Sequence, residues 1–398
     1  MENLKTVYPD KVDWSSVVES CRADSPFSDL IIDYLNLLSG ALLRDSRSRA
    51  YPDVVSFAFF CRRANIEALR QQYASGAGVR LGRGIVFHIA PSNVPVNFAY
   101  TLVAGLVCGN TNIVRIPSKS FPQVDIIAEH ISALNEHPVG KRIYLVQYDR
   151  SSEATAYFSS ICHARVIWGG DMTIDNIRRN PLPPRSSDVL FADRYSIAAI
   201  QADKMVAIEP IELAKLAEAF YNDTYLFDQN ACSAPHLVVW QGSKENVAQA
   251  QNRFWEAMQK VVEQKYAFQP IMGVDKLTAF YKHAIAHDIT KAPPVNNKLI
   301  RVQLNKLPAD IEAYRCACGY FSEYHAEGLD ELSSIITTKY QSLAYYGYTV
   351  EELEDFVTRT QLRGIDRIVP FGQTTAFSLT WDGYNLYEYL TRNISILS

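Results

Sequence analysis

Between residues 84 and 168, short apolar runs alternate with helix-like segments, and this alternation constrains the fold more than any other feature. Strands that are apolar along their whole length are buried on both faces, as in a parallel sheet covered by helices. The intervening helices supply the long crossovers that parallel strands need. We therefore expect an α/β sheet with strands at 84–90, 112–116, 142–147 and 164–168 and helices at 94–107, 124–134 and 151–160.

A second α/β series follows a proline-rich stretch, NPLPPR at 180–185, which we expect to be a hinge or linker. In this second series the apolar periodicity predicts strands at 196–200, 237–240, 299–304 and 342–346, and helices at 210–221, 246–266, 276–287 and 350–360. Two further helices, 26–43 and 53–73, precede the first sheet. The chain thus reads as two α/β units in series.

Composition narrows the class of protein. The chain has 398 residues, 48% hydrophobic and 21% charged, with a net charge of -4, so it has no basic footprint for nucleic acid or anionic lipid. No apolar run is long enough to span a membrane, and the polar N-terminus does not resemble a secretory signal. Seven cysteines, an odd number, favour reduced thiols, and no ligand spacing indicates a metal site. We expect a cytoplasmic enzyme.

Cys232 lies in a turn, FDQNACSAPH at 227–236, between a predicted helix and a predicted strand. Its small neighbours would let another molecule approach the sulfur closely, and Pro235 keeps the turn from continuing as helix. A single cysteine is more often a small buried apolar residue than a nucleophile. The turn alone therefore leaves both interpretations open.

Ser92 and Asn93 follow the first strand of the first series, in the segment APSNVP. Ligands of open α/β sheets bind beyond the carboxyl ends of the strands, so both residues are placed where a ligand is expected. The alternative is a turn in which Asn93 bonds its own backbone. Gly82 and Gly84 precede a strand rather than a helix, so they do not form a dinucleotide-binding fingerprint.

Four segments together resemble the aldehyde dehydrogenase superfamily: APSNVP, GNTNIVRIPSKSFP, WGG and FDQNAC, in the order found there. Within that superfamily the chain is most similar to the LuxC-type acyl-CoA (fatty acyl) reductases of bacterial luminescence. Three more blocks carry this similarity: KYQSLAYYG at 339–347, DRIVPFG at 366–372 and WDGY at 381–384. The first 80 residues match nothing specific.

The resemblance implies a fold and a division of the chain. We expect the aldehyde dehydrogenase-like α/β architecture, a cofactor-binding domain plus a catalytic α/β domain with the active site in the cleft between them. The expected boundaries are 1–195 for the N-terminal helices and the NAD(P)-binding domain, and 196–380 for the catalytic domain. Residues 381–398 would form a C-terminal segment packing on the first domain or on an oligomer partner.

The resemblance also implies a mechanism. Cys232 would attack an activated acyl group to form a thioester, and Asn93 would donate to the oxyanion. The superfamily's E-L-G-G-K segment, whose glutamate activates water, has no counterpart around residues 189–195, and we expect Glu209 to be structural. Its absence favours reductase over oxidase.

Cofactor-binding positions follow from the same segments: Ala90, Pro91, Ser92, Arg115, Pro117, Ser118, Lys119, Trp168, Gly169 and Gly170. A cationic pair, Arg115 and Lys119, stands where an acidic residue would hold the ribose of NAD, and such a pair suits a 2′-phosphate. NADPH is the expected cofactor, with NADH as the alternative. Trp168 is alternatively a core residue in a strand-ending turn.

The function expected is NADPH-dependent reduction of an acyl-CoA or acyl-enzyme thioester, with a fatty acyl group, to an aldehyde through Cys232. The alternatives are a CoA-acylating aldehyde dehydrogenase working in the oxidative direction and a non-redox cysteine acyltransferase or thioesterase. A homo-oligomer and an acyl-protein synthetase partner are expected by resemblance. No metal, nucleic acid or membrane is expected.

Overall fold

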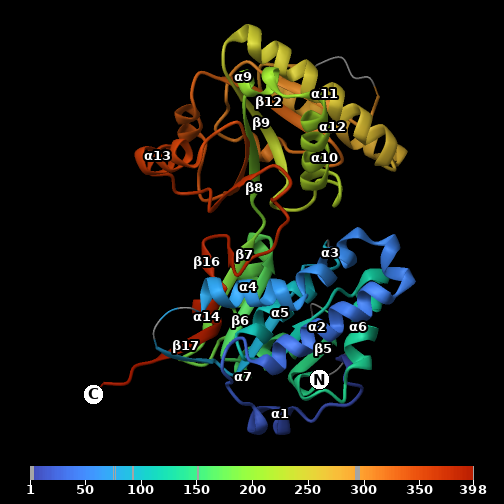
Figure 1. Cartoon of the computed structure of the whole chain (residues 1–398), viewed down its shortest axis with the longest axis vertical. Helices are drawn as coiled ribbons and strands as arrows, with labels where there is room; N and C mark the ends of the chain where they lie inside the picture. Colours follow the sequence, from blue (N-terminus) through green and yellow to red (C-terminus); the bar gives the residue numbers. More distant parts are fainter. Residues whose placement is uncertain are drawn as a thin grey trace. The chain divides into compact units, whose positions relative to one another are not determined.

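The computed structural model describes residues 4–74, 76, 78–91, 94–149, 152–291 and 296–397. The chain forms two compact units, one from Met1–Asp193 with Phe377–Ser398 and the other from Arg194–Ala376. Each unit contains its own sheet with helices packed on it (Figure 1). The stretch NPLPPR lies inside the first unit, before the strand Ser187–Ala192, so it does not link the two units.

The first unit is built on a six-stranded sheet in the spatial order β1-β5-β4-β3-β6-β7. Strands β3 to β7 are parallel, and β1 is an antiparallel edge strand. The bounds are Lys5–Tyr8 (β1), Ile85–Ile89 (β3), Thr111–Arg115 (β4), Ile143–Gln147 (β5), Ala164–Gly169 (β6) and Ser187–Ala192 (β7). The four strands expected here are confirmed, and β7, whose first two residues are polar, went unrecognised in the sequence.

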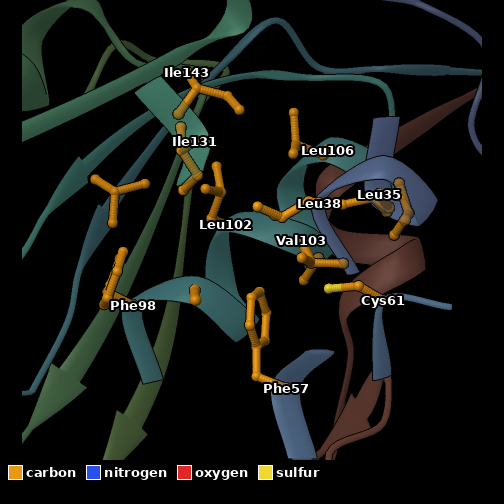
Figure 2. Close-up of a cluster of buried hydrophobic side chains, with 14 of the residues drawn as sticks. Leu35, Leu38, Phe57, Cys61, Phe98, Leu102, Val103, Leu106, Ile131 and Ile143 are labelled. Atoms are coloured by element: carbon orange, nitrogen blue, oxygen red, sulfur yellow. The ribbon is translucent and has the colours of Figure 1, made fainter. Parts of the chain in front are cut away.

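Helices cover both faces of this sheet because neighbouring strand residues point to opposite sides. Val86 belongs to the core shared with one set of helices, whereas Phe87 belongs to the core on the other side. On the first side lie α2 (Asp29–Arg44), α3 (Pro52–Phe60), α4 (Arg63–Tyr73), α5 (Asn97–Val107) and α6 (Pro122–Ala133); on the second lie α1 (Trp14–Ser20), α7 (Ala154–Ile161) and α8 (Asp171–Arg178). Figure 2 shows Leu102 and Val103 of α5 among the side chains of α2 and α3.

The C-terminal segment returns to the first unit. Strand β17 (Thr391–Ile394) pairs antiparallel with β2 (Val79–Gly82), and α14 (Leu386–Leu390) packs in the same core as α5. A short hairpin, β15 (Thr380–Trp381) and β16 (Tyr384–Asn385), precedes it. The indole of Trp381 is buried in that core.

The second unit is built on a seven-stranded sheet in the order β10-β11-β12-β9-β8-β13-β14. All pairs are parallel except β10 with β11. The strands are β8 (Tyr195–Gln201), β9 (Pro235–Gln241), β10 (Ile289–Lys291), β11 (Ile300–Leu304), β12 (Tyr320–Ala326), β13 (Tyr340–Tyr346) and β14 (Arg367–Pro370). The blocks at 339–347 and 366–372 thus supply the adjacent strands β13 and β14.

Helices again occupy both faces of the second sheet. Helices α9 (Ala202–Ala207), α10 (Pro210–Thr224) and α11 (Lys244–Lys265) pack on one face, and α13 (Val350–Thr360) with the 3-10 segments Ile311–Tyr314 and Leu329–Ser334 packs on the other. Helix α12 (Pro270–Ala286) lies over β10 and β11 at the sheet edge. The expected α/β fold, with parallel sheets covered on both faces, is confirmed.

Candidate functional site

Cys232 lies in a tight loop, residues 225–234, between the end of α10 and the start of β9. Its side chain is half-buried, and the next residue, Ser233, is buried. The hydroxyl of Ser196 on β8 donates to the carbonyl oxygen of Cys232 at 2.7 Å and accepts from the amide of Ser342 on β13 at 3.2 Å. One buried hydroxyl therefore fixes the backbone of Cys232 at the amino ends of the strands.

Gln229 holds the rest of this loop. Its side chain is buried, and its backbone is left-handed, with φ of 60°. Its Oε1 accepts from the amides of Gly319 and Tyr320 at 2.9 and 3.1 Å, and its Nε2 donates to the carbonyls of Pro235 and Tyr320 at 2.9 and 3.1 Å. All four bonds of one amide side chain thus join the loop to the starts of β9 and β12. The motif FDQNAC contained this residue, but no local pattern showed its role.

Asp228 gives the loop a third anchor. The hydroxyl of Tyr266 donates to Asp228 Oδ1 at 2.6 Å, and the Cys318 amide donates to the Asp228 carbonyl at 2.9 Å. Cys318 is left-handed, with φ of 62°, and lies in the bend that precedes β12. A loop held at so many points keeps the sulfur of Cys232 in one place.

Two ionisable neighbours in the sequence do not act as a base for Cys232. His236 is buried in β9, stacked on Tyr195 with ring centroids 5.6 Å apart, and burial lowers its pKa to about 3 with help from nearby Arg315. Glu209 is exposed at the start of α10, and the cysteine loop follows the end of that 15-residue helix. The length of this helix separates Glu209 from the cysteine loop by about 22 Å, far beyond hydrogen-bond reach.

The predicted cofactor residues gather at the carboxyl edge of the first sheet. Ile89 of β3 stands level with Arg115 of β4 and Ile167 of β6, so the segments that follow these strands leave the sheet side by side. From β3 the chain proceeds to β4 and β5 on one side and later to β6 and β7 on the other. The carboxyl ends of β3 and β6 thus form the topological switch point, the usual ligand position in such sheets.

Arg115 and Lys119 differ in their surroundings. The Arg115 guanidinium lies 4.8 Å from the Tyr148 ring centroid and donates to the Tyr148 carbonyl at 3.1 Å. Arg115 therefore contacts the residue that follows β5. Ser118 and Lys119 are exposed, with the Lys119 Nζ 5.2 Å from the ring of Phe121. Of the two cations, Lys119 is the more available to a ligand.

Trp168, Gly169 and Gly170 end β6 and begin α8. The Trp168 ring is buried, stacked on Phe191 at 4.0 Å, and its Nε1 donates to Thr101 at 3.4 Å, so the indole is part of the core. Gly170 precedes α8, and a Cβ built on it meets nothing within 4 Å. The space beside Gly170 suits a phosphate, because the N-terminus of a helix attracts anions.

Ala90 and Pro91 follow β3 directly, and the Ala90 amide donates to the Arg115 carbonyl at 3.2 Å. Pro117 accepts at its carbonyl from Gln147 at 2.7 Å. Ser92 and Asn93 lie outside the described residues, so the predicted oxyanion donor stays a prediction.

A cavity of about 390 Å³ lies elsewhere, at the carboxyl edge of the second sheet, beyond the ends of β8 and β9. Cys232 precedes β9, so the cavity and the sulfur are at opposite edges of the same sheet. Within the described residues no group of His, Cys, Asp and Glu side chains is placed to hold a metal ion. In the same residues no helix is both long and apolar enough to cross a membrane.

The fold defines a class of protein first. The chain superposes on an Escherichia coli lactaldehyde dehydrogenase with a TM-score of 0.65 and 14% identity, covering 92% of this chain and 86% of that one. A benzaldehyde dehydrogenase from Corynebacterium glutamicum, described as NAD-dependent, gives 0.64 and 13%, covering 99% and 94%. At these identities the comparisons show the fold alone, which is that of the aldehyde dehydrogenases.

The family follows from sequence. Residues 59–272 match the family model for acyl-CoA reductase (LuxC), and the chain belongs to that family. It is 25% identical over 198 residues to a long-chain acyl-protein thioester reductase of Vibrio harveyi, covering 49% of this chain and 38% of the relative. A protein of the same description from Photorhabdus luminescens is 23% identical over 164 residues, covering 40% and 32%. The matched region spans less than two fifths of either relative's length. The resemblance seen in the sequence is confirmed.

Proposed function

We propose that this protein reduces an activated acyl group, carried as a thioester, to an aldehyde, with Cys232 as the nucleophile. The observation that carries the proposal is the half-buried Cys232 in a loop anchored by Ser196 and Gln229. Membership of the acyl-CoA reductase family and the thioester reductases among its relatives supply the reaction class. The acyl donor we propose is acyl-CoA or an acyl-protein thioester with a long chain.

In this mechanism the Cys232 sulfur attacks the acyl carbonyl, and the donor thiolate leaves, so one thioester replaces another. Asn93 and the Cys232 amide are proposed to donate hydrogen bonds to the negative oxygen of the tetrahedral species. Removal of one such donor lowers the rate of an enzyme by about 100- to 1000-fold. A bound nicotinamide dinucleotide would supply the hydride to the thioester carbon. Collapse of the resulting hemithioacetal anion releases the aldehyde and returns Cys232 as thiolate.

The cofactor is proposed to lie along the carboxyl edge of the first sheet. Gly170 leaves room for the pyrophosphate at the start of α8, and the exposed Lys119 and Ser118 would hold an adenosine 2′-phosphate. This favours NADPH over NADH. Replacing Lys119 by Glu should raise the KM for NADPH at least tenfold and spare that for NADH, whereas Lys141→Glu, at another exposed lysine of the unit, should change neither. Equal effects on the two cofactors would contradict the choice of NADPH.

The central experiment incubates the chain with radiolabelled palmitoyl-CoA, first without cofactor and then with NADPH. We expect label on the protein, released as aldehyde when NADPH absorbance falls, and neither event in Cys232→Ala. Cys21→Ala removes another half-buried thiol and should behave as wild type. Label on Cys232 without NADPH consumption would support the acyltransferase or thioesterase instead, and label retained in Cys232→Ala would refute the nucleophile.

An acyl-protein synthetase that delivers the acyl group is also proposed, on the strength of the relatives' description as acyl-protein thioester reductases. A faster reaction with an acylated carrier protein than with acyl-CoA of the same chain length would support this donor.

A further inference from the structure

Helix α12 turns its large apolar side chains to solvent. Five of them, Ile271, Val274, Leu277, Tyr281 and Ile285, are between 45% and 88% exposed. A surface helix of a soluble protein normally buries such residues and exposes its polar ones. Figure 1 draws α12 at the periphery of the second unit.

The inward face of α12 carries two buried polar residues beside the partly buried Met272 and Phe280. Lys276 is buried, and its Nζ donates to the carbonyls of Asn297 and Lys298 at 2.8 and 3.3 Å. His283 is fully buried, with its ring stacked on Tyr314 at 5.1 Å. These polar contacts, with the packing of Met272 and Phe280, fix the helix in this orientation. The apolar stripe outside is left for another molecule to cover.

The exposed stripe has the spacing of a coiled-coil seam. Ile271, Val274, Thr278, Tyr281 and Ile285 follow one another at intervals of three, four, three and four residues, which are successive a and d positions. Thr278 fits such a seam because its hydroxyl donates to the Val274 carbonyl at 2.9 Å, which leaves its methyl group for packing. A seam of this kind accepts another helix.

The charges beside the stripe specify which helix fits. Asp275 and Lys282 are both exposed, and they stand on the same flank, three residues before and four residues after Thr278. In an antiparallel pair of identical helices crossing at Thr278, Asp275 of each copy meets Lys282 of the other, and Ile271 meets Ile285. In a parallel pair position e of one helix lies beside position g of the other, so Asp275 and Lys282 would not meet across the seam and neither ion pair could form. One exposed acid and one exposed base give no basic excess, so the face does not suit an anionic lipid surface.

We propose that α12 is a self-association surface, on which two copies of this chain pack antiparallel about a twofold axis at Thr278. Such an isologous contact is closed, because each copy uses its one α12. The Ile, Val and Tyr side chains supply the apolar contact, and the two ion pairs set the direction. The inference goes beyond the proposed reaction and does not depend on it.

The first test measures particle mass by analytical ultracentrifugation of the full chain. We expect the wild-type particle to contain an even number of chains, and the double variant V274D/I285E to show half that mass with a dissociation constant raised more than about 100-fold. Both side chains are largely exposed, so the variant should fold, as circular dichroism will show. Ile211→Glu, at an exposed isoleucine of α10, is the matched control and should keep the wild-type mass.

The second test addresses direction. Asp275→Lys alone and Lys282→Asp alone should each weaken association, and the double exchange D275K/K282D should restore it, because the pairs form between copies. Thr278→Cys should give a disulfide-linked dimer through position 278 on mild oxidation, identified by peptide mass spectrometry, and wild type should not. The proposal would be overturned if the wild type were monomeric or if the V274D/I285E particle kept the wild-type mass. It would also be overturned if the wild type bound phosphatidylglycerol vesicles and V274D/I285E did not.

Discussion

A carboxylate inside the second unit offers the sharpest test of how this fold is held together. Glu323 of β12 is 1% exposed and accepts four hydrogen bonds. Its Oε2 accepts from the indoles of Trp240 and Trp255 at 2.9 and 2.7 Å and from Gln251 at 3.0 Å, while its Oε1 accepts from Arg301 Nε at 2.7 Å. The two indoles donate to this carboxylate, whereas Gln251 also donates to Gln303 Oε1 at 3.2 Å.

Replacing Glu323 by Ala removes the acceptor of these donors. Removing one partner of a buried ion pair costs about 3–5 kcal/mol, and each buried indole N–H left without an acceptor costs about 1–3 kcal/mol. The lower ends of these ranges together give about 5 kcal/mol, a large share of the stability of an ordinary domain. With a urea m-value of about 2 kcal/mol/M, the midpoint of the second unit should fall by about 2.5 M.

Tryptophan fluorescence is the natural assay because Trp240 and Trp255 are the two tryptophans in the sequence of the second unit. Both indoles lose their acceptor in Glu323→Ala, so the emission should change in the folded variant as well as in the urea transition. Glu256→Ala, at an exposed glutamate of α11, is the control and should shift the midpoint little. An unchanged midpoint in Glu323→Ala would refute the reasoning.

Burial raises the pKa of the Asp223 carboxyl to about 6 from 3.8, so the folded state binds this proton more tightly than the unfolded chain does. Proton binding therefore stabilises the fold fully below pH 4, and this stabilisation is lost as the pH rises through 6. Between pH 4 and 7 the free energy of unfolding of the wild type should therefore fall by about 3 kcal/mol relative to that of Asp223→Asn. Urea unfolding of the two proteins at each pH measures this difference, and a constant difference across that range would contradict the prediction. Gln229→Leu leaves the amides of Gly319 and Tyr320 without their acceptor. Calorimetry should therefore show that the free energy of unfolding of the second unit falls by at least about 2 kcal/mol. Gly105→Ala places a Cβ 1.8 Å from Asn112 Oδ1 and should cost about 1–3 kcal/mol in urea unfolding, whereas Gly170→Ala, which meets nothing, should leave stability unchanged.

Elements with a strong local pattern were predictable. Strands β3, β4, β5 and β6 are apolar along most of their length, and their ends fall within two residues of the expected positions. Strand β7 was missed because its residues Ser187 and Asp188 interrupt the apolar run. Helix α12 begins at Pro270, six residues before the expected start.

For the site, local sequence indicated Cys232 and the strand ends, because a turn after a helix and an apolar run are both short-range patterns. It could not show that Gln229 bonds Gly319 and Tyr320, some 90 residues away, since that contact exists only when β12 lies beside β9. The same limit applies to Trp168, whose stacking on Phe191 needs β7 next to β6.

The amino-acid sequence by itself determined that the chain is a two-part α/β protein of the acyl-CoA reductase type, because periodicity and motif order are properties of the chain. The tertiary structure alone decided which polar groups meet inside. Glu323, Gln229 and Asp223 acquire their partners from strands and loops distant in sequence, and a buried polar group is stable only where the fold brings a partner to it. It also decided that α12 presents its apolar side outward, because Lys276 and His283 found their contacts within the unit.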